Sequence, residues 1–219
     1  MPRSVPPRVD PHARGHFVVY VEGPRDRDVL RCWARRQSPR LARALAPAFV
    51  ILGGRRPARA VEDLRRRREH HPDTAGLCVL DGDIGAGEPR ESEHGLELFT
   101  WERRHIESYL LVASAIQRAL RVSDQRFERV LREHLPDPED EDALRVLDAK
   151  RLLGPKGPFA RFLGRPVSVG QIARVMRSEE QGGEVVALLE RLGAGLGVAE
   201  AASVPSVTRS NGRIRPSPE

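Results

Sequence analysis

No hydrophobic run in the 219-residue sequence reaches the roughly 18 residues that a membrane-spanning helix needs. The first residues, MPRSVPPRVDPHARGH, also lack the apolar core of a secretory signal peptide. These two absences favour a cytoplasmic protein with no membrane partner. Cysteine is scarce as well, since Cys32 and Cys78 are the only two and have neither CxxC nor Cys/His spacing. We interpret them as buried thiols in a reducing compartment and expect no zinc site.

The usual nucleotide-binding loops are missing, because neither GxGxxG nor GxxxxGK[ST] occurs in the chain. Lysine is limited to Lys150 and Lys156, so the formal charge of +6 is carried almost entirely by arginine. The positive charge favours a polyanionic partner such as nucleic acid, since cationic side chains that contact phosphates release bound counterions.

Four apolar segments predict the strands of a sheet. They are FVVYV (17–21), AFVIL (48–52), GLCVL (76–80) and GLELFTW (95–101). The first is rich in β-branched residues without polar alternation, which is typical of a strand buried on both faces of a parallel sheet. Helical spacing follows the first strand, with Asp26 as the predicted N-cap, and follows the second, with Pro57 in the first turn. This alternation predicts an α/β fold with right-handed crossovers.

The chain divides into four predicted parts. Residues 1–15 contain four prolines and few apolar groups, and we expect this segment to be disordered. Residues 16–112 form the predicted α/β domain. The amphipathic segments of residues 113–202 predict a helical subdomain that packs on the sheet or covers its acids. Residues 203–219 are polar and contain proline, so we expect a flexible tail.

Acidic residues follow two of the predicted strands. Glu22 comes directly after the first strand, and Asp81 and Asp83 end the third. Ligands of parallel sheets gather at the carboxyl ends of the strands, and residues two apart in an extended chain project to the same side. Carboxylates this close repel one another unless a cation lies between them, and clustered hard oxygens suit Mg²⁺ or Mn²⁺. The sequence therefore predicts a divalent-metal site.

Three motifs together resemble the Toprim domain, which topoisomerases, bacterial primases, recombination proteins and nucleases of the OLD (overcoming lysogenization defect) family share. The motifs are VEGPRD, LDGD and WERRHIESYLL. A strand that ends in tryptophan and is followed by an IExYLL segment is similar to the OLD branch in particular. The resemblance covers residues 16–112 and implies a Toprim-like, Rossmann-like fold with a four-stranded parallel sheet flanked by helices.

The resemblance also implies roles for individual residues. The acids that match the family's site, and that would hold two Mg²⁺ or Mn²⁺ ions, are Glu22, Asp26, Asp81, Asp83 and Glu107. Glu22 is in addition a candidate acid/base. OLD-type enzymes use a lysine downstream of the acids, and we favour Lys156, in a GPKG turn, over Lys150. The implied activity is metal-dependent hydrolysis of phosphodiester bonds.

Several of these residues have a second interpretation. Asp26 alone suits a simple helix cap, and Glu107 alone suits a solvated helix position beside two arginines. The run DGDIGAGEPRESEH is longer than a tight turn, and it either covers the site or moves Asp83 away from it. His105 is a candidate for proton transfer or an ordinary surface histidine. The four-arginine run is either a solvated face or a contact for a nucleic-acid backbone; it comprises Arg65, Arg66, Arg67 and Arg68.

Substrate and partners stay open at the level of sequence. We favour DNA as the substrate. RNA such as transfer RNA is an alternative, and so is a Toprim module that binds nucleic acid or protein without cleaving. Topoisomerase activity is disfavoured because the only tyrosines, Tyr20 and Tyr109, lie in predicted core segments. Many OLD-type proteins carry an ATPase domain on the same chain, so the resemblance implies a separate ATPase partner here and a role in antiviral defence or DNA processing. A homo-oligomer is left open.

Overall fold

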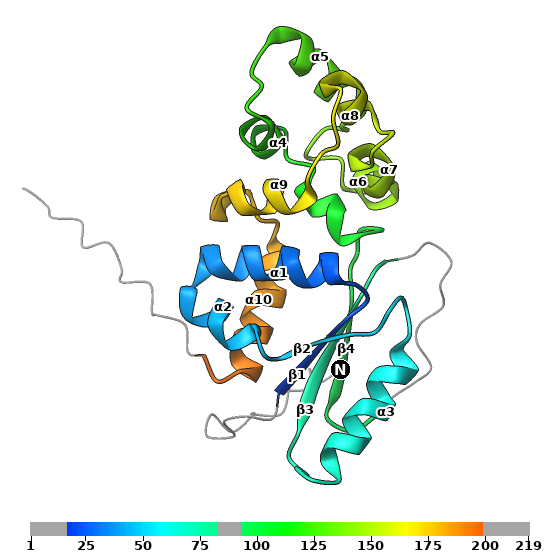
Figure 1. Cartoon of the computed structure of the whole chain (residues 1–219), viewed down its shortest axis with the longest axis vertical. Helices are drawn as coiled ribbons and strands as arrows, with labels where there is room; N and C mark the ends of the chain where they lie inside the picture. Colours follow the sequence, from blue (N-terminus) through cyan, green and yellow to red (C-terminus); the bar gives the residue numbers. More distant parts are fainter. Residues whose placement is uncertain (1–16, 83–92, 199–219) are drawn as a thin grey trace, which may run out of the picture.

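The centre of the molecule is an all-parallel, four-stranded sheet with strand order β2-β1-β3-β4 (Figure 1). The strands are β1 (Phe17–Val21), β2 (Phe49–Ile51), β3 (Ala75–Leu80) and β4 (Leu96–Thr100). The predicted parallel α/β sheet is confirmed. The computed structural model describes residues 17–82 and 93–198, so the predictions for the N-terminal segment, the C-terminal tail and the glycine-rich run after Gly82 lie outside the described residues.

Register aligns the carboxyl ends of the central strands. Val21 at the end of β1 is paired with Ile51 of β2 on one side and with Val79 of β3 on the other. Glu22 follows β1 directly, and Asp81 follows β3 directly. The two acids therefore leave the sheet at the same edge from adjacent strands, as the sequence predicted.

Helices cover both faces of the sheet (Figure 1). One face is covered by α1 (Pro24–Gln37), α2 (Pro39–Leu45) and α10 (Gly183–Gly195), and the other by α3 (Pro57–Arg68). Val19 and Val21 pack into the core on the α1 side, whereas Val18 and Tyr20 pack on the α3 side. Burial on both faces explains why β1 shows no polar alternation.

The first helix begins earlier than predicted. The N-cap of α1 is Gly23, and Pro24 occupies the first turn, where its missing N–H and fixed φ are tolerated. Asp26, the predicted N-cap, lies three residues inside, and its Oδ2 accepts a hydrogen bond from the Gly23 N–H at 2.7 Å. The N-cap prediction for Asp26 was therefore wrong, because the proline two residues upstream already starts the helix.

The segment after β4, which begins with the WERRHIESYLL motif, forms two separate helical pieces. The first is a 3₁₀ helix, η1 (Ile106–Leu110), and the second is α4 (Ala113–Leu120). Between them, Val112 has an extended backbone with φ −101° and ψ 115°. Every residue of η1 is buried, so Glu107 does not occupy a solvated helix face. That alternative for Glu107 is wrong.

The remaining described helices lie C-terminal to α4. They are α5 (Gln125–His134), α6 (Glu141–Val146), α7 (Ala149–Leu153), α8 (Pro158–Leu163), α9 (Val169–Val175) and the 3₁₀ helix η2 (Ser178–Glu180). Helices α4 to α8 gather at one end of the molecule, α9 lies along α1, and α10 returns to the sheet (Figure 1). The helical region thus both packs on the sheet and lies near its carboxyl edge. Among the described helices, none is long and apolar enough to cross a bilayer.

Candidate active site

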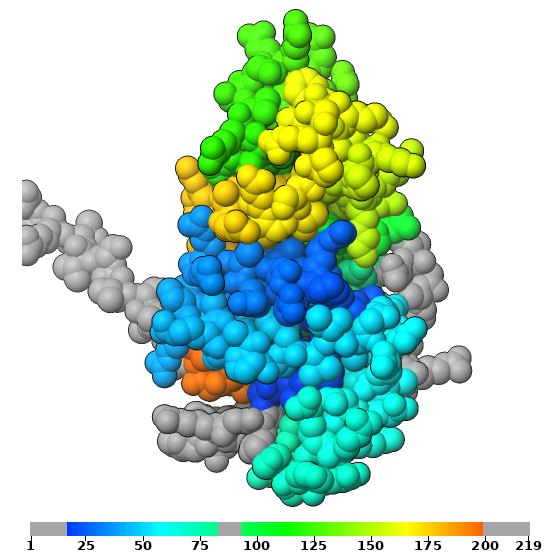
Figure 2. Space-filling view, in the orientation of Figure 1, coloured from blue at the N-terminus to red at the C-terminus, as the bar shows by residue number. Residues whose placement is uncertain are grey.

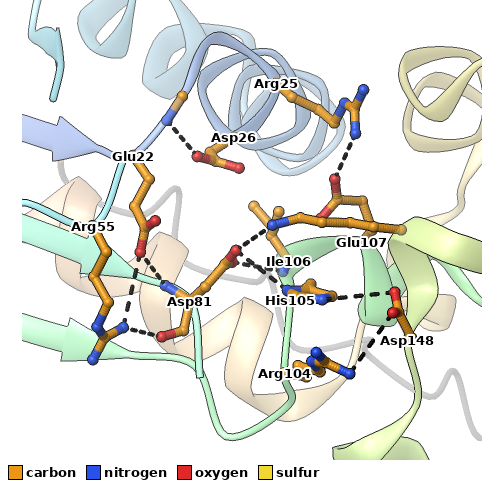
Figure 3. A network of polar contacts seen from close by, with 12 residues as sticks. Glu22, Arg25, Asp26, Arg55, Asp81, Arg104, His105, Ile106, Glu107 and Asp148 are labelled. Atoms are coloured by element: carbon orange, nitrogen blue, oxygen red, sulfur yellow. Dashed lines mark hydrogen bonds and ion pairs between the residues drawn. The ribbon is translucent and has the colours of Figure 1, made fainter. Parts of the chain in front are cut away.

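Glu22 and Asp81 are joined directly at the carboxyl edge of the sheet (Figure 3). The Asp81 backbone N–H donates to Glu22 Oε1 at 2.9 Å. Arg55, from the connection between β2 and α3, donates from Nη1 to the Asp81 carbonyl oxygen, and the same nitrogen lies 3.9 Å from Glu22 Oε1. Arg55 was not predicted from the sequence. The feature of the sequence that could have indicated Arg55 is its position directly after the two glycines that follow the β2 segment.

The Asp81 carboxylate is buried and surrounded by donors. Its Oδ1 accepts from the Ile106 N–H at 3.2 Å, and its Oδ2 accepts from Lys150 Nζ at 2.6 Å. His105 Nδ1 lies 3.4 Å from the same Oδ2. A buried carboxylate is stable only when such partners replace water, so these contacts fix the position of the Asp81 side chain.

His105 is buried between two carboxylates, and so the alternative of a surface histidine is wrong. Its Nε2 lies 3.9 Å from Asp148 Oδ1, while its Nδ1 faces Asp81. Asp148 is the residue that caps α7, since its side chain accepts from the Arg151 N–H. His105 therefore connects the acid at the end of β3 with the helix that carries Lys150.

The lysine that reaches the acids is Lys150. Its burial lowers the pKa, but the hydrogen bond to Asp81 and the charges of Asp81, Glu107 and Asp26 outweigh that effect and raise it, so the amine stays protonated. Lys156, which the sequence favoured, is exposed, and its carbonyl oxygen accepts from Arg161 Nη1 at 2.9 Å. Within the described residues, Lys156 forms no ion pair or hydrogen bond with any acid of the site.

Glu107 brings a further carboxylate to this edge from η1. It is fully buried, and its Oε1 pairs with Arg25 Nη1 at 3.1 Å. Its Oε2 is buried without a hydrogen-bond partner among the described residues. Leaving a buried acceptor unsatisfied costs about 1–3 kcal/mol. This oxygen is therefore available to bind a cation or to accept a hydrogen bond from a ligand. Arg25, which the sequence did not point to, shares the first turn of α1 with Asp26.

The pKa of Asp26 depends on the other acids of the site. Burial, followed by the negative charges of Asp81 and Glu107, raises its pKa from 3.8 to about 7, although the Gly23 N–H and Lys150 act in the opposite direction. The carboxylates of Glu22, Asp26, Asp81 and Glu107 face a common space in Figure 3. The structure therefore brings together four of the five predicted acids; the fifth, Asp83, lies outside the described residues.

A basic side chain lies against three of these acids. Arg55 lies against Glu22, Lys150 against Asp81 and Arg25 against Glu107. Within residues 17–82 and 93–198, no three His, Cys, Asp or Glu side chains are arranged so that they could hold one metal ion. The predicted two-ion site stays a prediction.

The four-arginine run is not part of this cluster. Helix α3 begins after the carboxyl end of β2 and runs back toward the start of β3, which places its last residues at the opposite edge of the sheet (Figure 1). Arg65 pairs with Glu93, and Arg67 pairs with Asp63 at 2.6 Å. Arg68 donates to the carbonyl oxygen of Pro72 in the turn that follows and to that of His94 just before β4. Contact between Arg65–Arg68 and nucleic acid stays a prediction, but at a place remote from the acids.

This chain is similar to known proteins in structure, but the sequence comparisons found no match. No protein-family model matches the sequence, and no curated protein matches it. The chain is similar to the C-terminal region of the Xanthomonas campestris pv. campestris OLD protein, with 14% identity and a TM-score of 0.46 over 84% of this chain and 95% of that chain. The C-terminal region of the Burkholderia pseudomallei OLD protein is similar with 15% identity and a TM-score of 0.45, over 83% and 98%.

Proposed function

We propose that this chain is a divalent-metal-dependent nuclease that hydrolyses phosphodiester bonds of DNA. The observation that carries the proposal is the convergence of Glu22, Asp26, Asp81 and Glu107 on one space at the carboxyl edge of the sheet. Burying acids beside one another is costly, and such clusters with shifted pKa values concentrate at functional sites. The acids come from separate elements, so a simple run of surface charge does not account for them.

The donor set fits a hard divalent cation. All four side chains offer carboxylate oxygens, which Mg²⁺ and Mn²⁺ prefer, and Glu107 Oε2 has no protein donor among the described residues. Glu22, Asp26, Asp81 and Glu107 would hold the ion or ions, with Asp83 as the further ligand that the resemblance implies. The ion pairs of Asp81 with Lys150 and of Glu107 with Arg25 would have to open or be shared. When bound, the cation supplies positive charge at the phosphate and lowers the pKa of a bound water.

The protein's own residues supply the rest of the chemistry. In hydrolysis, a water oxygen bonds to phosphorus, the ester P–O bond breaks, and the leaving oxygen takes up a proton. Glu22 is oriented by the Asp81 N–H and is the candidate acid/base for these proton transfers. The Lys150 ammonium stabilises negative charge that develops on the phosphate, and Arg25 offers a second cation at the same side. We assign to Lys150 the lysine role for which the sequence favoured Lys156.

A binding module without hydrolysis is the second candidate. It is favoured by the three basic side chains that already neutralise the acids, and by the absence, in the described part of the chain, of three metal ligands placed together. RNA stays an alternative substrate because metal-assisted cleavage uses the same chemistry. Activation by a separate ATPase and a role in antiviral defence or DNA processing follow from the resemblance to OLD-type proteins and are part of the proposal.

Cleavage assays with isosteric variants test the function. Supercoiled plasmid, linear duplex and total transfer RNA are incubated with Mg²⁺, Mn²⁺ or EDTA. We expect the wild type to cut DNA only with metal, and Asp81→Asn and Glu22→Gln to lose at least about 100-fold in rate, because each removes a carboxylate that would hold the cation or, for Glu22, transfer a proton. Glu128→Gln, an exposed change on α5, is the matched control. Cutting in EDTA, or unchanged cutting by both site variants, would count against a metal-dependent nuclease, and binding without any cutting would favour the module.

A further inference from the structure

A cavity of about 680 Å³ lies between the start of α1 and the segment from α7 to α9. Figure 2 shows these two parts of the chain meeting on one face, with α1 in blue and residues around 150–170 in yellow-green and yellow. Val29, Leu153 and Val167 are among the apolar residues of its wall. The cavity is thus formed where the helical region meets the α/β core.

The cavity and the candidate active site share three charged residues. Arg25, Glu107 and Lys150 line the cavity, and the same side chains belong to the acid cluster. Arg25 is well exposed, with 59% of its side chain accessible, although its guanidinium is held at Glu107. A ligand in the cavity would therefore meet cationic groups on the side that faces the acids.

The dimensions and chemistry of the cavity match one nucleotide. Ligand cavities of about 300–1,000 Å³ with mostly apolar walls and a few polar groups are typical of small-molecule sites. The faces of a nucleobase suit the aliphatic walls, and its attached phosphate suits Arg25 and Lys150. A cavity of about 680 Å³ has room for one nucleotide but not for a stacked, base-paired duplex. A nucleotide that enters must be unstacked and unpaired.

We propose that this cavity binds one unpaired nucleotide of the DNA strand, next to the phosphodiester bond that is cut. The inference rests on the proposed function and narrows its substrate class to single-stranded or locally opened DNA. A base-paired nucleotide cannot enter the cavity. The duplex therefore has to be opened locally before its phosphate reaches the acids.

Gly170 provides a variant that fills the cavity without disturbing the fold. It lines the cavity within α9, a side chain there would have no atom within 4 Å of its Cβ, and its φ is not positive. Gly170→Trp therefore places a ring in open space. Gly183→Trp is the matched control, because Gly183 at the start of α10 is equally open but lies outside the cavity.

Fluorescence anisotropy of a labelled eight-nucleotide single strand, and of a hairpin duplex, measures the affinity with Ca²⁺ or EDTA in place of Mg²⁺. We expect Gly170→Trp to weaken binding of the single strand by at least about tenfold and Gly183→Trp to stay within about twofold, with thermal melting unchanged in both. Binding of the single strand by Gly170→Trp at wild-type affinity overturns the inference, and so does a wild type that does not bind the single strand.

The binding assay needs no hydrolysis, so the two proposals fail separately. If the wild type cuts nothing in any metal but Gly170→Trp still loses affinity for the single strand, the cavity assignment holds and the nuclease proposal fails. If the wild type cuts DNA and Gly170→Trp binds and cuts single strands unchanged, the nuclease proposal holds and the cavity assignment fails.

Discussion

Asp81 is the residue at which most contacts of the site converge. Its carboxylate accepts hydrogen bonds from Lys150 and from the Ile106 N–H. Its own N–H donates to Glu22, and its carbonyl oxygen accepts a hydrogen bond from Arg55. The position of Asp81 is thus set by residues from several parts of the chain. The sequence identified Asp81 from its place at a strand end, but the partners that fix it were not visible there.

Lys150 and Lys156 form a natural pair of variants. We expect Lys150→Met to lower the rate of DNA cleavage by about 10²–10³-fold, because it removes the ammonium beside Asp81 and leaves that buried carboxylate short of a partner. Lys156→Met removes an exposed lysine that contacts no acid among the described residues, and we expect its rate to stay within about twofold of the wild type. Rates are measured on the same plasmid, with melting temperatures as a check on folding. Loss of activity in Lys156→Met alone would restore the choice made from sequence.

At the scale of elements, the start of α1 makes a pH-dependent contribution to the stability of the fold. The pKa of Asp26 is raised in the fold from 3.8 to about 7, chiefly by burial and then by the charge of Asp81. A carboxyl group with a raised pKa supports the fold in its neutral form. Its contribution is complete below its unfolded pKa, declines as pH rises through the interval up to about 7, and is lost above that.

Thermal melting in EDTA at pH 5 and pH 8 tests this contribution of Asp26 to stability. We expect the stability of the wild type to fall between these values relative to Asp26→Asn, which cannot ionise at this position. Added Mg²⁺ or Mn²⁺ should recover stability at pH 8, since a cation favours the charged carboxylate. Parallel pH profiles of wild type and Asp26→Asn in EDTA would contradict the account of Asp26.

Secondary structure was predictable where local chemistry decided it. The apolar run of β1 and the proline that opens α3 gave the correct elements. The short helix α2 was missed because its seven residues carry little periodic signal. The break between η1 and α4 was missed because it depends on burial of all of η1, including Glu107, against the rest of the molecule. Tertiary packing decided these two segments.

At the scale of the whole molecule, the site joins distant parts of the chain. Lys150 is 69 residues from Asp81, and Arg25 is 82 residues from Glu107. The acids were predictable because each follows a recognisable strand or lies in a motif. Their basic partners were not, because nothing local in the sequence specifies which arginine or lysine the helical region brings to the carboxyl edge. One continuous core also joins α7, α9 and α10 to the sheet, so packing places the helix that carries Lys150.

Binding of Mn²⁺ tests the central claim most directly, namely that these acids hold a divalent cation. Free Mn²⁺ is followed by electron paramagnetic resonance as protein is added at pH 7.5. We predict that the wild type binds Mn²⁺, that Asp81→Asn and Glu107→Gln each weaken binding by at least about tenfold, and that the exposed change Glu128→Gln leaves it unaltered. A wild type that binds no Mn²⁺, or site variants that bind it as tightly as the wild type, would contradict the claim.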